Sequence, residues 1–87
     1  MQSQLNLIHK ILALSIKINH TKKKIVWVDI DGHWSSFNVR YCGVPYTKKM
    51  EYDETVYLDR SPIEYFEEMY NHLEDVYEEL TEVSYAE

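Results

Sequence analysis

The chain has 87 residues and a formal net charge of −6, which is enough length for one small domain with a thin core. Its single cysteine, Cys42, cannot form an internal disulfide, and no apolar run reaches the roughly 18 residues that a membrane-spanning helix requires. These features argue against a disulfide-stabilised secreted domain and against a membrane protein, and they predict a single cytoplasmic domain over residues 1–87.

Positive and negative residues are separated along the chain. Residues 1–50 hold eight Lys or Arg and two Asp, whereas residues 51–87 hold thirteen Asp or Glu and one Arg. A basic half and an acidic half in one small domain should create a strong dipolar field. The negative net charge argues against ordinary nucleic-acid binding.

The first predicted element is a helix from Gln4 to about Ile18. Leucine and isoleucine recur there at spacings of three and four residues, which is typical of an amphipathic helix with a wide apolar face. The residues of that face are Leu5, Leu7, Ile8, Ile11, Leu12, Leu14, Ile16 and Ile18.

A β-hairpin is predicted next. Lys24–Ile30 is rich in β-branched and aromatic residues, and the dipeptide Asp31-Gly32 is favoured in two-residue type I′ turns. Such a turn would place Val28 opposite Ser35 on the returning strand, which runs to Tyr41. The predicted core face consists of Val26, Val28, Ile30, Phe37, Val39 and Tyr41. The opposite face carries Ile25, Trp27, Asp29, Trp34, Ser36, Asn38 and Arg40, with Trp27 and Trp34 as diagonal neighbours.

A third strand, Glu54–Leu58, and a long helix from Ser61 to about Ser84 complete the predicted fold. Ser61 is a favourable N-cap, Pro62 suits the first helical position, and Glu64 would complete a capping box. The inner row of this helix is Ile63, Phe66, Met69, Tyr70, Leu73, Val76, Tyr77, Leu80 and Val83. We therefore predict an α+β fold of order αβββα, in which two helices cover one face of a three-stranded antiparallel sheet and leave the other face open.

Polar residues around the predicted turn could suggest chemistry. Ile25–Gly32 resembles the first motif of haloacid-dehalogenase-type phosphatases, an apolar strand that leads into Asp-x-Asp-Gly. The turn explains Asp31 and Gly32 without catalysis, and 87 residues cannot house the parallel sheet and further ligands of that family. Asp29, Asp31 and His33 could also approach a metal ion, but the tight turn between them weakens that geometry. We predict no catalytic, cofactor-binding or metal-binding residue and no enzymatic activity.

The outer side of the last helix is acidic. Residues 61–87 contain nine Asp or Glu and no Lys or Arg, and like charges four residues apart should cost about 0.2–0.5 kcal/mol per pair. Folding does not explain these acids, which leaves solubility or a basic partner that is bound by imitating a run of phosphates. The predicted partner-binding residues are Glu67, Glu68, Glu74, Asp75, Glu78, Glu79 and Glu82, with Trp27 and Trp34 as aromatic anchors.

The overall build resembles small phage-encoded proteins, including acidic inhibitors of bacterial defence such as type II anti-CRISPR proteins. The resemblance rests on chain length, on the order helix–hairpin–strand–helix, on the hairpin Ile25–Tyr41 and on the acid-rich segment Glu51–Glu87. It implies a stoichiometric inhibitor in the cytoplasm of a bacterial host cell, whose acids occupy a DNA site of a nuclease, such as the region that reads the protospacer-adjacent motif. Such a protein would bind neither nucleic acid, a membrane nor a cofactor.

Two other functions remain open at this point. The sheet face with Ile25, Trp27 and Trp34 could pair with a second copy, which would make the chain a self-associating structural or accessory protein, so that monomer and homodimer are both possible. Alternatively, Lys22–Lys24 and Arg40 could bind a small nucleotide together with the aromatic residues.

Overall fold

The computed structural model describes residues 2–33, 35–46 and 49–85, and its side chains are described as far as Thr81. The predicted order αβββα is confirmed. The elements are α1 (Gln2–His20), β1 (Lys24–Asp31), β2 (Ser36–Gly43), β3 (Tyr52–Tyr57) and α2 (Ile63–Tyr85).

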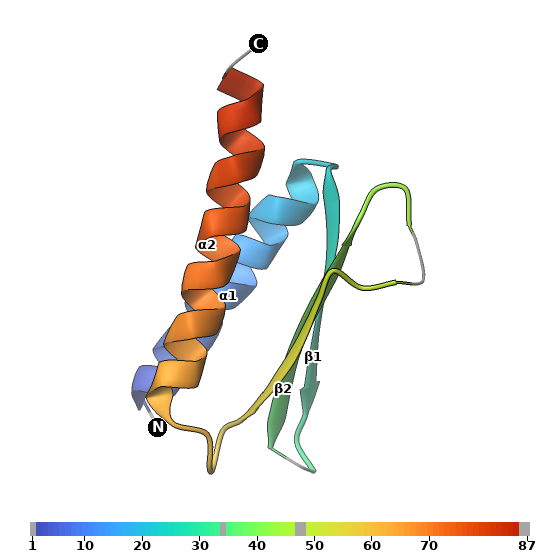
Figure 1. The fold of residues 1–87 in the computed structure, drawn as a ribbon. Coiled ribbons are helices and arrows are strands. Elements are labelled where there is room, and N and C mark those ends of the chain that lie inside the picture. Colours follow the sequence, from blue (N-terminus) through green and yellow to red (C-terminus); the bar gives the residue numbers. More distant parts are fainter. Residues whose placement is uncertain (1, 34, 47–48, 86–87) are drawn as a thin grey trace.

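The elements form two layers. β2 lies between β1 and β3, and both strand pairs are antiparallel. The helices pack against each other and cover the same face of the sheet, with α1 against β1 and α2 on the side of β3 (Figure 1). Among the described residues, neither helix has the length and apolar character needed to cross a lipid bilayer.

A continuous apolar core separates the two layers. Its fully enclosed side chains come from α1, β2 and α2: Ile11, Ile18, Phe37, Val39, Phe66 and Leu73. The inner row predicted for the last helix is therefore correct where it is described, since Met69 and Val76 are buried as well. Burial of this row explains why an acidic segment is helical.

Two predicted apolar faces are too wide. Leu5 and Ile16 of α1 are 36% and 60% exposed, because α1 turns a narrower side, centred on Ile11 and Ile18, toward β1 and α2. Ile30, which we predicted to face the core, is 61% exposed. At this end of β1 the ribbons of the helices and of the sheet lie farther apart than at the start of the strand (Figure 1).

The predicted hairpin register is wrong by four residues. Val28 pairs with Val39, and Asp31 pairs with Ser36, so the connection comprises residues 32–35 rather than a two-residue turn. Ser35 adopts a positive φ of 54°, and the Asp31 carboxylate accepts a hydrogen bond from the backbone N–H of His33 at 3.0 Å. With this longer connection, Val28 of β1 lies directly opposite Val39 of β2. A shift of four residues is even, so the assignment of side chains to the two faces is preserved.

The boundaries around β3 also differ from the prediction. β3 begins at Tyr52, two residues before the predicted start, while Val56 is buried as expected. The last helix begins at Ile63 rather than just after Ser61. The Ser61 hydroxyl accepts a hydrogen bond from the backbone N–H of Tyr57 at 2.8 Å, so it fastens the turn between β3 and α2.

A side-chain amide joins α1 to the sheet. Asn19 Nδ2 donates to the backbone carbonyl of Val26 at 3.1 Å, and Asn19 Oδ1 accepts from the Val26 N–H at 2.8 Å. The amide thus occupies both hydrogen-bonding groups of Val26 on the outer edge of β1, as a neighbouring strand would. This arrangement fixes the angle at which the chain leaves the helix and enters the sheet.

Candidate partner-binding surface

The solvent side of α2 carries two groups of carboxylates in one row, separated by a gap between Glu68 and Glu74. At 3.6 residues per turn, the eight acids from Glu64 to Glu82 fall within an arc of about 140° around the helix axis. The buried row with Phe66 and Leu73 lies on the opposite side. We call this set the acidic stripe: Glu64, Glu67, Glu68, Glu74, Asp75, Glu78, Glu79 and Glu82.

The structure places most of the predicted helix residues in solvent. Glu67, Glu68, Asp75, Glu78 and Glu79 are exposed, and Glu74 is half-buried. The Glu74 carboxylate accepts a hydrogen bond from the Tyr70 hydroxyl at 2.8 Å, and the side chain of Glu82 lies outside the described part of the chain. The described carboxylates of the predicted set therefore share one side of one helix.

The linear charge density of the stripe resembles that of a nucleic-acid strand. Glu64 and Glu82 are 18 residues apart, which at a rise of about 1.5 Å per residue corresponds to roughly 27 Å. Eight carboxylates over this length have a mean axial spacing of about 3.9 Å, compared with about 3.4 Å per phosphate along one strand of B-DNA. A surface that binds phosphates through Lys and Arg would thus meet a similar density of negative charge.

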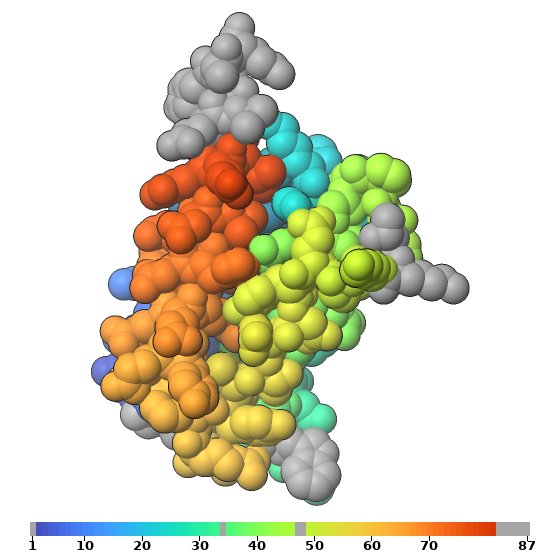
Figure 2. All heavy atoms as spheres, in the orientation of Figure 1, coloured from blue at the N-terminus to red at the C-terminus, as the bar shows by residue number. Residues whose placement is uncertain are grey.

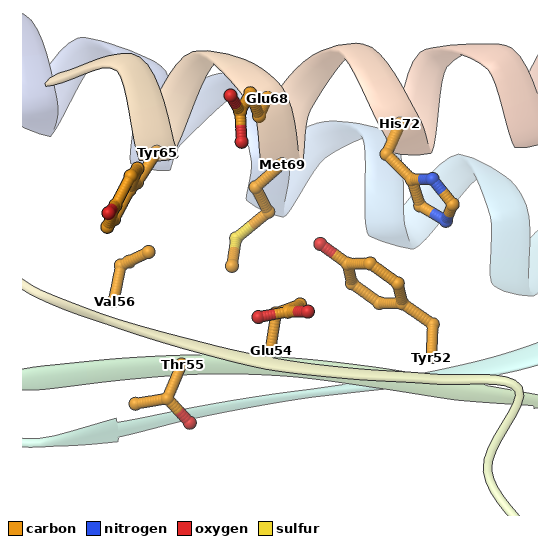
Figure 3. Close-up of a pocket in the computed structure, with 8 residues that line it drawn as sticks. All are labelled: Tyr52, Glu54, Thr55, Val56, Tyr65, Glu68, Met69 and His72. Carbon is orange, nitrogen blue, oxygen red and sulfur yellow. The ribbon is translucent and has the colours of Figure 1, made fainter.

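A groove runs between α2 and β3, beside the stripe. In the space-filling view, α2 (orange) and β3 (yellow) meet along a seam on this side of the molecule (Figure 2). The groove has a volume of about 370 Å³ and is lined by Tyr52, Glu54, Thr55, Val56, Tyr65, Glu68, Met69 and His72. Figure 3 shows Tyr65, Met69 and His72 projecting from α2 toward the strand, and Tyr52 and Glu54 projecting from β3 toward the helix. We call this feature the α2–β3 groove.

Stacked rings close one end of the groove. The rings of Tyr52 and His72 are nearly parallel, with centroids 4.3 Å apart, and Tyr52 also stacks on Tyr41 at 5.4 Å. The hydroxyl of Tyr41 lies 2.8 Å from Nε2 of His72 and is hydrogen-bonded to it. Because Tyr41 is buried in the core, the stack holds the Tyr52 and His72 rings in fixed positions.

Acids from three segments surround this stack. The pKa of Tyr52 is raised to about 12, first by burial and then by the negative charges of Glu54, Tyr41 and Glu68. The pKa of Tyr41 is also raised, by burial and by the charges of Glu51 and Glu79. Both phenols therefore remain neutral at physiological pH, and the groove lies in a negative potential.

The sheet face that carries Trp27, which we call the tryptophan face, is less open than predicted. Trp27 is half-buried, because Tyr46 packs edge-on against its ring at 5.8 Å and the Arg40 guanidinium lies 5.8 Å from the ring centroid. Cys42 on the same face is fully enclosed. The chain after β2 folds back over this end of the sheet, which covers the surface expected to be free. Trp34, the second predicted anchor, lies outside the described residues.

The polar residues near the hairpin turn do not form a metal centre in the described part of the chain. No three His, Cys, Asp or Glu side chains there are grouped as metal ligands would be. Asp29 instead pairs with Arg40 at 3.3 Å. The turn and this ion pair account for the positions of Asp29 and Asp31.

Sequence reasoning missed the β3 side of the site. Glu54 lies two residues before Val56 and points to the same side of the strand, toward α2, although its side chain remains exposed. A carboxylate at a core-facing position of a strand is an unusual signal that the sequence does contain. On α2, Tyr65, Glu68 and His72 follow one another at spacings of three and four residues and form the facing wall.

Comparisons of this chain with protein-family models, curated proteins and solved structures give no match. Its function has to be inferred from the charge and the shape of the surface itself. The resemblance to phage-encoded inhibitors stays a prediction.

Proposed function

We propose that the chain is a non-enzymatic binding protein that docks its acidic stripe on a basic, nucleic-acid-binding surface of another protein. The observation that carries this proposal is the stripe itself: eight acidic residues along one side of α2, at a mean density close to that of phosphates along a strand. Carboxylates at this density would attract a partner over long range and raise its association rate.

The stripe has no role in folding that would explain it. Glu67, Asp75, Glu78 and Glu79 are exposed and take part in no ion pair among the described residues. Like charges one turn apart repel each other, so the stripe costs stability instead of adding to it. A surface that lowers the stability of a small domain is more readily explained by binding than by structure.

Because the carboxylates would imitate phosphates, the partner should be a protein that binds phosphates. A surface that accepts a carboxylate stripe in place of phosphates belongs to an enzyme that handles nucleic acid, and the chain would compete there with DNA. If the resemblance to phage proteins holds, the enzyme is a defence nuclease of a bacterial host and the chain is its stoichiometric inhibitor.

The two other functions have less support. Lys24 pairs with Glu51, Lys23 Nζ donates to the carbonyl of Leu80 at 3.2 Å, and Arg40 pairs with Asp29. Three of the four cations expected to hold a nucleotide are thus engaged within the chain, whereas Lys22 is exposed. Self-association through the tryptophan face would first require the covering residues around Tyr46 to move.

The test is capture of partners by the immobilised chain from a bacterial lysate, followed by elution with salt or with duplex DNA. A matched variant carries Gln or Asn in place of Glu74, Asp75, Glu78 and Glu79. We expect the wild-type chain to capture nucleic-acid-binding proteins that salt and DNA displace, and the neutral variant to lose them. Capture that ignores ionic strength, or that survives in the neutral variant, contradicts the proposal.

A further inference from the structure

We infer that the α2–β3 groove receives an arginine side chain of the partner protein. This inference rests on the proposed function. It identifies the groove as the place where the acidic surface would distinguish arginine from other side chains of the partner. It is carried by the shape of the groove, by its aromatic wall and by two carboxylates that form no ion pair among the described residues.

The groove has the dimensions and lining of a small binding site. Its volume of about 370 Å³ lies at the lower end of the range for ligand sites, about 300–1,000 Å³. Met69 and Val56 are buried beneath it, while the Tyr52 ring is fixed by stacking on His72. The floor is therefore apolar and one wall presents aromatic rings held in place by the core.

Two carboxylates at this groove carry charge that the chain does not neutralise. Glu54 on β3 and Glu68 on α2 both line the groove and both are exposed. Neither belongs to an ion pair among the residues that the structure describes. Together they repel anions and favour a cation between strand and helix.

Arginine fits this combination better than lysine does. A guanidinium is planar, stacks on aromatic rings and can donate to carboxylates on two sides, whereas an ammonium is compact and strongly hydrated. Its three-carbon stem would lie over Met69 and Val56, and its head would reach Glu54 and Glu68.

The groove and the stripe are one surface. Glu68 belongs to both, and Glu79, near the other end of the stripe, contributes to the negative potential at Tyr41. A basic partner that lies along α2 would therefore bring an arginine to the groove without a change in orientation. The stripe supplies attraction, and the groove selects for a planar cation.

The experiment uses three blocked tripeptides as probes, Gly-Arg-Gly, Gly-Lys-Gly and the uncharged Gly-citrulline-Gly, titrated into the full chain. Binding is followed by NMR through the Met69 methyl group and the Tyr52 ring. We expect the arginine peptide to shift these signals, the lysine peptide to bind several-fold more weakly and the citrulline peptide not to bind. Shifts that are equal for all three peptides, or that avoid Met69 and Tyr52, overturn the inference.

A pair of matched variants separates the groove from the stripe. Glu54→Gln with Glu68→Gln removes two charges at the groove, and Glu67→Gln with Glu78→Gln removes two charges from the other edge of the stripe. We expect about a tenfold loss of arginine-peptide affinity in the first variant and less than about twofold in the second. All four residues are exposed, so both variants should fold, which circular dichroism verifies. Equal losses in both variants overturn the inference.

The peptide titration requires no partner protein, which keeps the two proposals distinguishable. Salt-sensitive capture of partners without arginine binding in the groove would refute the groove alone. Arginine binding in the groove without salt-sensitive capture would refute the stripe as the docking surface.

Discussion

Neutralising two acids at the C-terminal half of the stripe should make the protein more stable. We consider the double variant Glu78→Gln with Glu79→Gln, since both side chains are exposed and the change alters neither shape nor core. It removes three like-charge pairs at a spacing of four residues: Glu74–Glu78, Asp75–Glu79 and Glu78–Glu82.

The size of the effect follows from these pairs. At about 0.2–0.5 kcal/mol per pair, three pairs amount to about 0.6–1.5 kcal/mol. We therefore expect the free energy of unfolding to rise by about 1 kcal/mol at low ionic strength.

Equilibrium unfolding in urea, followed by circular dichroism, measures this difference. The increase in the free energy of unfolding should become much smaller in about 1 M salt, because the screening length there is only about 3 Å. Glu67→Gln serves as the control, because its neighbours at four residues are Ile63 and Asn71, and its stability should change little. If the double variant is no more stable than the wild-type chain at low salt, the stripe does not cost stability. Binding would then not be needed to explain why the stripe is present.

Three further predictions test the fold and the groove. Phe66→Ala should destabilise the domain by about 3–5 kcal/mol because the ring is fully enclosed, whereas Tyr65→Ala, at a 54% exposed residue, should cost far less in the same urea titration. Asn19→Ala should cost about 1–3 kcal/mol, since it leaves the N–H and the carbonyl of Val26 without their amide partner; an unchanged urea midpoint would refute this role. The pKa of Tyr52 is raised in the folded state from 10.0 to about 12, so the stability that its neutral form provides is complete below pH 10 and is lost as the pH rises toward 12. Tyr52→Phe should therefore lessen the loss of stability over this range, by about 1–2 kcal/mol after allowance for solvent screening, in thermal melts recorded at successive pH values.

The order of the elements could be predicted because it depends on local pattern. The leucine and isoleucine spacing before Ile18, the β-branched run from Lys24 and the inner row through Phe66 and Leu73 each specify one element and one buried side. These signals do not depend on how the elements meet in space. For this reason the αβββα order and most of the core were correct.

The hairpin register and the coverage of the tryptophan face could not be predicted in the same way. The register depends on the conformation of the connection, where Ser35 adopts a positive φ, and on the total apolar pairing between the strands. Both Asp31-Gly32 in a two-residue turn and the four-residue connection satisfy the alternation of side chains. The burial of Trp27 depends on Tyr46, which is 19 residues away and belongs to a segment without periodicity.

The groove could not be predicted because it arises between two elements. Glu54 precedes α2, and only the packing of the helix over β3 makes Glu54 and Glu68 line the same groove. The sequence does contain the acids and the rings, but their meeting depends on the angle at which α2 crosses the strand. Residue types therefore indicated the charge of the proposed binding surface, and tertiary structure was needed to find its shape.

The stripe and the core row lie on opposite sides of α2, so binding and folding can be altered separately along most of this helix. The exception is the α2–β3 groove, where Glu68 of the stripe adjoins Tyr52, and Tyr52 stacks on the buried ring of Tyr41. A cation bound there would contact side chains that the core itself holds in place. Because a ligand that binds only the folded state stabilises that state by mass action, arginine in the groove should raise the melting temperature. A cation bound only at the outer edge of the stripe, near Glu67 and Glu78, would affect melting mainly through screening, which any salt also provides.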